Sequence, residues 1–232
     1  MRAIENPTES ISIFALKIIS MNSVLIVLIA TTAIVSFRGF SDIAFFRKYE
    51  FHVGSIRAGD QIRMFSSAFL HADIGHLAFN MLTLYFFAPV VIAHVESLGF
   101  LLIYVGSLIT GSLLTLLFHK DDYSYRAIGA SGAVMGVLYS AILFEPNSEI
   151  ALYYIIKMPA YVFGIGYLLY TIYGMKAKND NIGHTAHFGG AVGGYVITLM
   201  KDPAMFTDNT FMVVLLAIPI IILFVLARFG KI

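Results

Sequence analysis

The chain has 232 residues, of which 59% are hydrophobic and 12% are charged, and its mean hydropathy is +0.83. So little polar sequence cannot cover the exterior of a soluble fold of this length, and we therefore predict a polytopic membrane protein. The net charge of +1 and the lack of a basic run give no reason to expect a nucleic acid or an acidic partner. Because the chain has no cysteine, disulfides, thiolate metal sites and a cysteine nucleophile are excluded.

Seven stretches of the chain approach the roughly 20 apolar residues that a membrane span needs. We predict spans at 18–37, 76–95, 99–118, 128–144, 151–173, 182–200 and 211–228. The predicted fold class is an all-α membrane helical bundle. We expect it to consist of an N-terminal segment (1–17), a six-helix core (18–203) and an additional C-terminal transmembrane helix (204–232). The polar N-terminus is followed by an apolar run long enough to stay in the bilayer, so we expect no cleavable signal.

The stretch 38–75, between the first two predicted spans, is long and mixes charged residues with apolar ones. It contains four aromatic residues, Phe45, Phe46, Tyr49 and Phe51. Water is a poor environment for these rings, so we predict a folded element that is partly embedded in the membrane.

Each polar group inside a predicted span needs a partner or a function, and three such residues stand out. Asn80, Ser131 and His187 belong to the second, fourth and sixth spans. These spans run in the same direction, so their starts share one face of the membrane. At 1.5 Å of rise per residue, we expect the three side chains within about one helical turn of the same depth, roughly 5 to 8 Å inside the helix starts.

Small residues predict close packing between the fourth and sixth spans. Gly132 and Gly136 form one pair with small-xxx-small spacing, and Gly190 and Gly194 form another. Such pairs let two helix backbones approach each other closely. We expect this approach to bring the serine and the histidine into contact.

Contact between Ser131 and His187 would create a nucleophile. A serine hydroxyl becomes reactive when a base within about 2.6 to 3.2 Å takes its proton, and a neutral imidazole is the usual base near pH 7. No carboxylate inside a span is placed to orient His187, so we predict a Ser-His dyad and not a triad. Free N–H groups at the helix start would hold an oxyanion together with His76 and Asn80, which share a helix face.

Other interpretations of these residues are possible. A serine among glycines most often serves packing, and a buried asparagine often forms an interhelical hydrogen bond. A metal site is another alternative, with the ligands His71, His76, His184 and His187. Asp73 lies near the first two of them in the sequence, whereas metal sites usually have several supporting partners. None of these interpretations explains the shared depth of the three polar residues.

Three segments resemble, in order and spacing, the signature segments of the rhomboid intramembrane serine proteases. They are HADIGHLAFN at 71–80, GASGAVMG at 129–136 and AHFGGAVGG at 186–194. The resemblance covers residues 54–201. It implies a six-helix rhomboid core in which the stretch 38–75 lies sideways in the membrane.

The resemblance also assigns roles to residues. It implies that Ser131 is the nucleophile and His187 the general base, and that His76 and Asn80 form the oxyanion hole with the backbone N–H of Ser131. Around them lie the supporting positions His71, Gly129, Gly132, Met135, Gly190 and Gly194. Structural positions implied by the same match are Arg63, before the second span, and Glu96, at its end.

Some features depart from the family pattern. Many rhomboids carry an aromatic residue four positions after the serine, packed on the histidine, where this chain has Met135. A thioether can pack on an imidazole edge, so we expect a looser dyad that remains active. Ile62 stands where a tryptophan often precedes the arginine. With the seventh span, the chain resembles the six-plus-one arrangement of the family, which puts the C-terminus outside. The distribution of Lys and Arg between the loops favours the opposite orientation. We follow the family orientation.

The function implied is that of an intramembrane serine endopeptidase that cleaves transmembrane segments of other membrane proteins. We expect no cofactor, no metal and no nucleic acid, and the resemblance implies transmembrane substrates and the lipid bilayer as partners. It implies a multi-pass protein of the bacterial inner membrane with a site open to the extracytoplasmic side. One alternative is a rhomboid-like protein that binds clients without cutting them. A transporter is another, but its repeated halves and paired charges are not visible.

Overall fold

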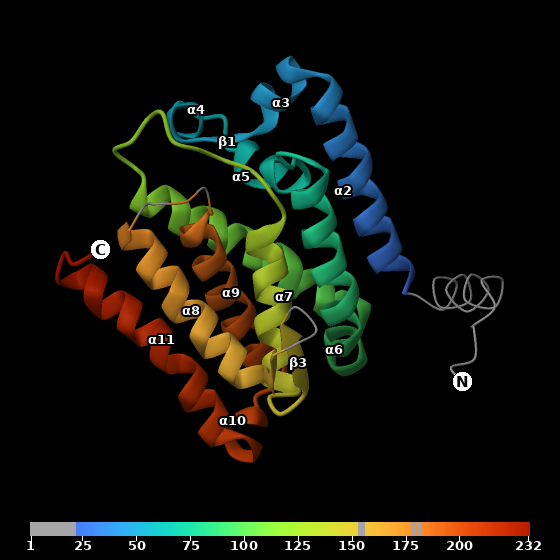
Figure 1. Ribbon diagram of the computed structural model, residues 1–232, viewed down its shortest axis with the longest axis vertical. Helices are drawn as coiled ribbons and strands as arrows, with labels where there is room; N and C mark the ends of the chain where they lie inside the picture. Colours follow the sequence, from blue (N-terminus) through green and yellow to red (C-terminus); the bar gives the residue numbers. More distant parts are fainter. Residues whose placement is uncertain (1–21, 153–155, 178–179, 181) are drawn as a thin grey trace, which may run out of the picture.

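The computed structural model describes residues 22–152, 156–177, 180 and 182–232 (Figure 1). The long helices are α2 (Ser23–Ser41), α6 (Ile74–Phe118), α7 (Ser131–Phe144), α8 (Ala160–Ala177), α9 (His184–Lys201) and α11 (Thr210–Arg228). The short elements are α3 (Ile43–Tyr49), β1 (Phe51–His52), α4 (Val53–Arg57), α5 (Arg63–Ser66), the 3-10 helix η1 (Ser67–Phe69), β2 (Arg126–Ala127), β3 (Glu149–Leu152), β4 (Ile156–Pro159) and α10 (Met205–Asp208).

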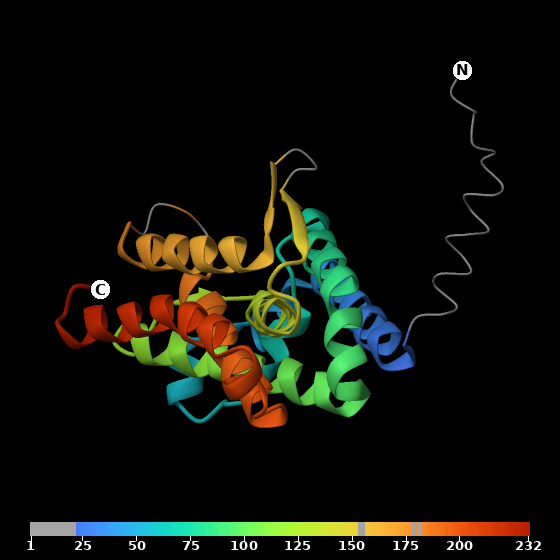
Figure 2. The ribbon, with the colours of Figure 1, turned by 90° about the horizontal axis from the view of Figure 1, so that it is seen from below.

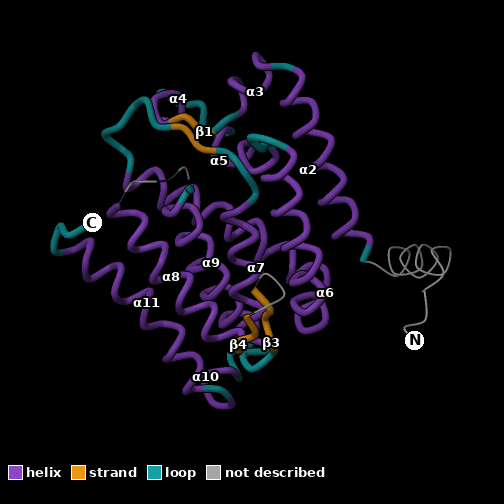
Figure 3. The backbone as a smooth tube through the Cα atoms, viewed as in Figure 1, coloured by secondary structure: helices purple, strands orange, loops and turns teal. Residues whose placement is uncertain are grey.

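These elements form an all-α membrane bundle, as predicted. By length and composition, α2, α6 and α11 can each cross a membrane. The elements α3, α4, β1 and α5 gather at one end of the bundle, while α10, β3 and β4 lie at the other (Figure 3). Figure 2 shows α7 end-on in the middle of the bundle, and every residue from Gly132 to Leu143 is buried. The helix with the GASG segment is therefore the central one.

Helix α6 contains the second and third predicted spans. Asp73 caps its start by accepting a hydrogen bond from the backbone N–H of His76 at 2.8 Å. The helix is interrupted at Glu96, whose φ of 59° and ψ of −179° are not helical. Glycine tolerates such backbone angles far better than other residues do. Glu96, which the resemblance places at the end of the second span, is thus the break between the second and third spans.

Helices α7 and α9 touch through their backbones. A Cβ atom on Gly190 would lie 1.8 Å from the carbonyl oxygen of Gly132, and one on Gly194 would lie 2.1 Å from that of Gly136. Such distances leave no room for any side chain. The predicted close approach of the two glycine pairs is confirmed.

The start of the fifth predicted span, at residue 151, is wrong. Strands β3 and β4 pair as an antiparallel hairpin that projects from the bundle (Figure 2), and α8 begins only at Ala160. Pro159 lacks an N–H group and disfavours helical angles in the residue before it, so a helix starts more readily after it.

The first predicted span and the loop after it are partly confirmed. Residues 18–21 lie outside the described part of the chain, and α2 continues to Ser41, beyond the predicted end at 37. The stretch 38–75 is folded, as predicted, because it contains the end of α2 together with α3, α4, α5, η1 and β1. Strand β1 pairs with β2, which precedes α7.

The additional helix α11 packs on α8 at the side of the bundle (Figure 1). Leu216 and Leu223 are buried in the same apolar cluster as Leu168 of α8. Two tyrosines bond the backbone of α11: the hydroxyl of Tyr139 donates to Leu216 O at 3.2 Å, and that of Tyr195 donates to Val213 O at 2.8 Å. The C-terminal helix therefore shares a core with α7, α8 and α9.

Candidate active site

Ser131 is the first residue of α7 and not, as predicted, about three residues inside it. Gly129 has a positive φ of 111°, which turns the chain sharply, so the helix begins only after this turn. No side chain caps the N-terminus at Ala130. Ser131 is half-buried beside backbone N–H groups that have no partner within the helix.

The expected common depth of the three polar residues is therefore wrong in detail. His187 is the fourth residue of α9 and Asn80 the seventh of α6. At 1.5 Å per residue they lie about 4.5 Å and about 9 Å inside their helix starts, whereas Ser131 lies at the start itself. The polar residues still share the end of the bundle where α6, α7 and α9 begin.

Ser131 and His187 lie next to a backbone contact between their helices. A Cβ atom on Gly132 would lie 3.1 Å from the carbonyl oxygen of Ala186. Ser131 precedes Gly132, and His187 follows Ala186. Both side chains are half-buried. In the part of the chain that the structure describes, no hydrogen bond joins Ser131 to His187.

His187 has a partner on a third helix. The hydroxyl of Tyr167, on α8, lies 2.8 Å from Nδ1 of His187. No pattern in the sequence singled out Tyr167. A phenol inside an apolar span needs a hydrogen-bond partner, and this requirement is the signal that singles it out.

The ring of His76 lies against the turn before Ser131. Its Nδ1 accepts a hydrogen bond from the backbone N–H of Ala72 at 3.4 Å, so Nε2 carries the proton of the neutral ring. A Cβ atom on Gly129 would lie 2.9 Å from Nε2 of His76 and 3.8 Å from Oγ of Ser131. Only glycine fits here, and the N–H donor of His76 lies beside the serine.

His71 connects this turn to α2. The backbone N–H of Ala130 donates to Nε2 of His71 at 3.3 Å, so Nδ1 carries the proton and donates to Oγ of Ser36 at 2.8 Å. The hydroxyl of Ser36 in turn donates to Phe69 O at 2.9 Å. Burial lowers the pKa of His71 to about 3. The neutral imidazole therefore holds the backbone of Ala130, the residue just before Ser131, in place.

Asn80 and Met135 are both buried. The amide nitrogen of Asn80 donates to His76 O, one turn back in α6, at 3.0 Å. An amide nitrogen carries two N–H donors, so this bond leaves a second one. Met135 belongs to the apolar cluster between α7, α8, α9 and α11.

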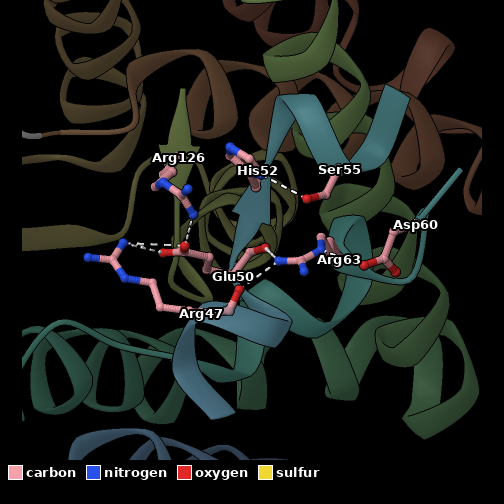
Figure 4. A network of polar contacts seen from close by, with 7 residues as sticks. All are labelled: Arg47, Glu50, His52, Ser55, Asp60, Arg63 and Arg126. Carbon is pink, nitrogen blue, oxygen red and sulfur yellow. Dashed lines mark hydrogen bonds and ion pairs between the residues drawn. The ribbon is translucent and has the colours of Figure 1, made fainter. Parts of the chain in front are cut away.

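An ion-pair network in the first loop holds the strand before α7 (Figure 4). Glu50 is 2% exposed, and its carboxylate pairs with Arg126 of β2 and, at 3.1 Å, with Arg47. Arg63 donates to the backbone oxygens of Arg47 at 2.8 Å and Glu50 at 3.2 Å, and its Nε bonds Asp60 at 2.6 Å. The first loop is thus tied to the segment that leads to Ser131.

The metal interpretation finds no support in the structure. Nε2 of His184 lies 3.0 Å from a carboxylate oxygen of Asp180. The described residues contain no group of three or more histidines and carboxylates arranged to hold a metal ion.

The fold and this site define an integral membrane protein built around a central helix that begins at a serine. Residues 58–203 match the rhomboid domain, so the chain belongs to the rhomboid family. This range nearly coincides with the extent of the resemblance in the sequence.

Three relatives show how far the similarity reaches. The chain is 28% identical over 172 residues to RHOMBOID-like protein 12, mitochondrial, of Arabidopsis thaliana, covering 68% of this chain and 51% of that protein. Two Bacillus subtilis (strain 168) proteins are also similar. Putative rhomboid protease YdcA is 31% identical over 144 residues (61% and 68% covered), and rhomboid protease GluP is 34% identical over 142 residues (60% and 26%). The chain thus spans about half the length of the Arabidopsis protein.

Proposed function

We propose that this chain is an intramembrane serine endopeptidase that cleaves transmembrane segments of other membrane proteins. One observation carries the proposal: Ser131 begins α7 at an uncapped N-terminus, beside the backbone contact with the helix that bears His187. The residues proposed as nucleophile, base and oxyanion donors all lie at one end of the bundle, which supports the proposal. Two bacterial relatives are named rhomboid proteases.

The chemistry follows the order of acyl transfer. Oγ of Ser131 attacks the substrate carbonyl, and Nε2 of His187 takes the hydroxyl proton. His187 then gives this proton to the departing amine, and an acyl-enzyme remains on Ser131. Water, activated by His187, attacks the ester and releases the acid product, which restores the serine.

The negative charge on the carbonyl oxygen needs donors during this attack. The backbone N–H of Ser131 lies at the positive end of the α7 dipole. The Nε2–H of His76 and the remaining N–H of Asn80 supply side-chain donors on α6. Loss of one such donor typically lowers the rate on the order of 10² to 10³-fold.

The dyad must tighten before the attack. Catalytic hydrogen bonds are often long without a substrate and close in the Michaelis complex. Ser131 and His187 lie next to the contact of Gly132 with Ala186, and we propose that changes in their side-chain torsion angles close the pair.

A second candidate function is the binding of membrane clients without cleavage. One observation favours it: no hydrogen bond joins Ser131 to His187 among the described residues. Both side chains are nevertheless present and neighbouring, so we favour the protease. We also propose a location in the bacterial inner membrane, with the site open to the extracytoplasmic side, as the family resemblance implies.

Cleavage of a single-span reporter protein in liposomes tests the proposal. Ser131→Ala and His187→Ala are expected to abolish cleavage, because the first removes the nucleophile and the second the base. Ser124→Ala removes an exposed loop serine and is expected to cleave at the wild-type rate. If Ser131→Ala cleaves as fast as the wild type, the chain is not a protease of this kind.

A further inference from the structure

The general base of a serine hydrolase needs a group that holds its ring in one tautomer. A neutral imidazole carries one proton, and Nε2 can accept the serine proton only if that proton sits on Nδ1. In the Ser-His-Asp arrangement, a carboxylate accepts the Nδ1–H and fixes both the tautomer and the ring orientation. The proposed dyad has no such carboxylate.

The loop between α8 and α9 contains a carboxylate, but that of Asp180 is engaged elsewhere. It accepts hydrogen bonds from the backbone N–H of Ile182 at 3.1 Å and the hydroxyl of Tyr170 at 3.2 Å, and it lies 3.0 Å from Nε2 of His184. The Ile182 N–H is the main cause that lowers the pKa of Asp180. Among the described residues, no carboxylate bonds His187.

We propose that Tyr167 is the positioning residue of this site: its hydroxyl accepts the Nδ1–H of His187 and keeps Nε2 free to take the proton of Ser131. The hydroxyl lies 2.8 Å from Nδ1, within the range of a good hydrogen bond. The two rings are 6.1 Å apart between centroids and tilted by 30°. This inference rests on the proposed function and adds a third residue to it.

The packing of α8 on α9 keeps the hydroxyl of Tyr167 in place. Gly174 lies two turns beyond Tyr167 on the same face of α8. A Cβ atom on Gly174 would lie 2.1 Å from Nε2 of His184, so α8 meets the first turn of α9 in direct contact. Leu168, beside Tyr167, is fully buried. The phenol thus lies on the face of α8 that packs on the first turn of α9.

A hydroxyl suits this position better than a carboxylate would inside the bundle. Placing a charged group in an apolar interior is costly, whereas a neutral phenol oxygen accepts a hydrogen bond without that desolvation. A neutral hydrogen bond is also weaker than a charge-assisted one. We therefore expect removal of the hydroxyl to slow the reaction moderately and not to abolish it.

The test compares Tyr167→Phe with the wild type in the reporter assay and in labelling by a fluorophosphonate probe. The variant keeps the ring and loses only the oxygen. We expect kcat to fall about tenfold, with KM changed less than twofold, and the labelling rate to fall by the same factor. Tyr173→Phe is the matched control, because Tyr173 is on α8 and 61% exposed, and we expect wild-type values for it.

A second readout does not depend on catalysis. Nitrogen NMR of histidine-labelled protein reports which ring nitrogen carries the proton, and His187→Asn assigns the signal. We expect the Nδ1–H tautomer in the wild type and a mixture of tautomers in Tyr167→Phe. An Nε2–H tautomer in the wild type, or the same spectrum in both proteins, would overturn the proposal.

The two proposals fail in different ways. If Ser131→Ala is inactive while Tyr167→Phe cleaves and is labelled at the wild-type rate, the protease stands and the role of Tyr167 is wrong. If the wild type neither cleaves nor is labelled, the proposed function fails, and the NMR measurement still decides whether Tyr167 fixes the ring of His187. The melting temperature of Tyr167→Phe is measured alongside and is expected to stay close to that of the wild type.

Discussion

His71 shows how one side chain outside the proposed chemistry supports it. The ring is fully buried, and its two nitrogens bond the backbone of Ala130 and the hydroxyl of Ser36. The bond from Ala130 requires the neutral form, because Nε2 accepts it, and a charge here would be desolvated. The imidazole therefore stabilises the fold only while it stays unprotonated.

Protonation of His71 leads to a pH-dependent stability. Its pKa is about 3 in the folded protein and about 6.5 in the unfolded chain. The unfolded state therefore binds more protons between these values, so the contribution is complete above pH 6.5 and is lost as the pH falls towards 3. Between pH 7 and pH 5 we expect a loss of about 2 kcal/mol from this residue.

Thermal unfolding in micelles at several pH values measures this effect. His71→Gln cannot titrate, so its melting temperature is expected to fall less between pH 7 and pH 5 than that of the wild type. An equal fall in both proteins would show that His71 is not the group responsible.

At the scale of elements, the contact of α7 with α9 is held by glycines. Gly190→Ala places a methyl group where the carbonyl oxygen of Gly132 already lies, so the helices must move apart. We expect a loss of stability of about 1 to 3 kcal/mol or more and slower labelling, because Ser131 and His187 separate.

The control for this substitution lies on α8. Gly166 has no atom within 4 Å of the position where a Cβ would lie. Gly166→Ala is expected to be neutral or to stabilise by up to about 1 kcal/mol, since alanine favours helices. Equal melting temperatures for Gly190→Ala and Gly166→Ala would contradict the tight packing of α7 on α9.

The pairing of β1 with β2 is a second contact between elements that positions the start of α7. The ion pair of Glu50 with Arg126 supports this pairing. Arg126→Met leaves the buried carboxylate with Arg47 alone and frees the strand before α7. We expect a loss of stability of about 1 to 3 kcal/mol and slower labelling of Ser131. Arg47→Met is the comparison.

Arg47 lies three residues from Glu50, so losing its ion pair does not loosen β2. We expect the unfolding temperature and the labelling rate of Arg47→Met to stay closer to those of the wild type. A larger effect of Arg47→Met than of Arg126→Met would contradict the bracing of β2.

For the whole molecule, apolar runs predicted the bundle because a membrane core accepts few other structures. They identified α2, α6 and α11 well, and the glycine spacing predicted the contact of α7 with α9. They failed at β3 and β4, since a short apolar run with β-branched residues fits a strand or a helix equally well. In this region, α8 starts only after the β3–β4 hairpin and Pro159.

The site was predictable only in part. Asn80, Ser131 and His187 were predicted near helix starts, and they do lie at one end of the bundle. The turn at Gly129 moved the start of α7 to Ser131, because a glycine alone does not indicate a positive φ. Tyr167 was missed because its partner His187 lies on another helix, and no sequence period connects the two.

The most direct test of the central claim is labelling by a fluorophosphonate probe in reconstituted membranes. The wild type and Ser131→Ala are compared, and mass spectrometry locates the adduct. We expect an adduct on Ser131 of the wild type and none on the variant. An unlabelled wild type, or equal labelling of both proteins, would contradict an activated serine at the start of α7.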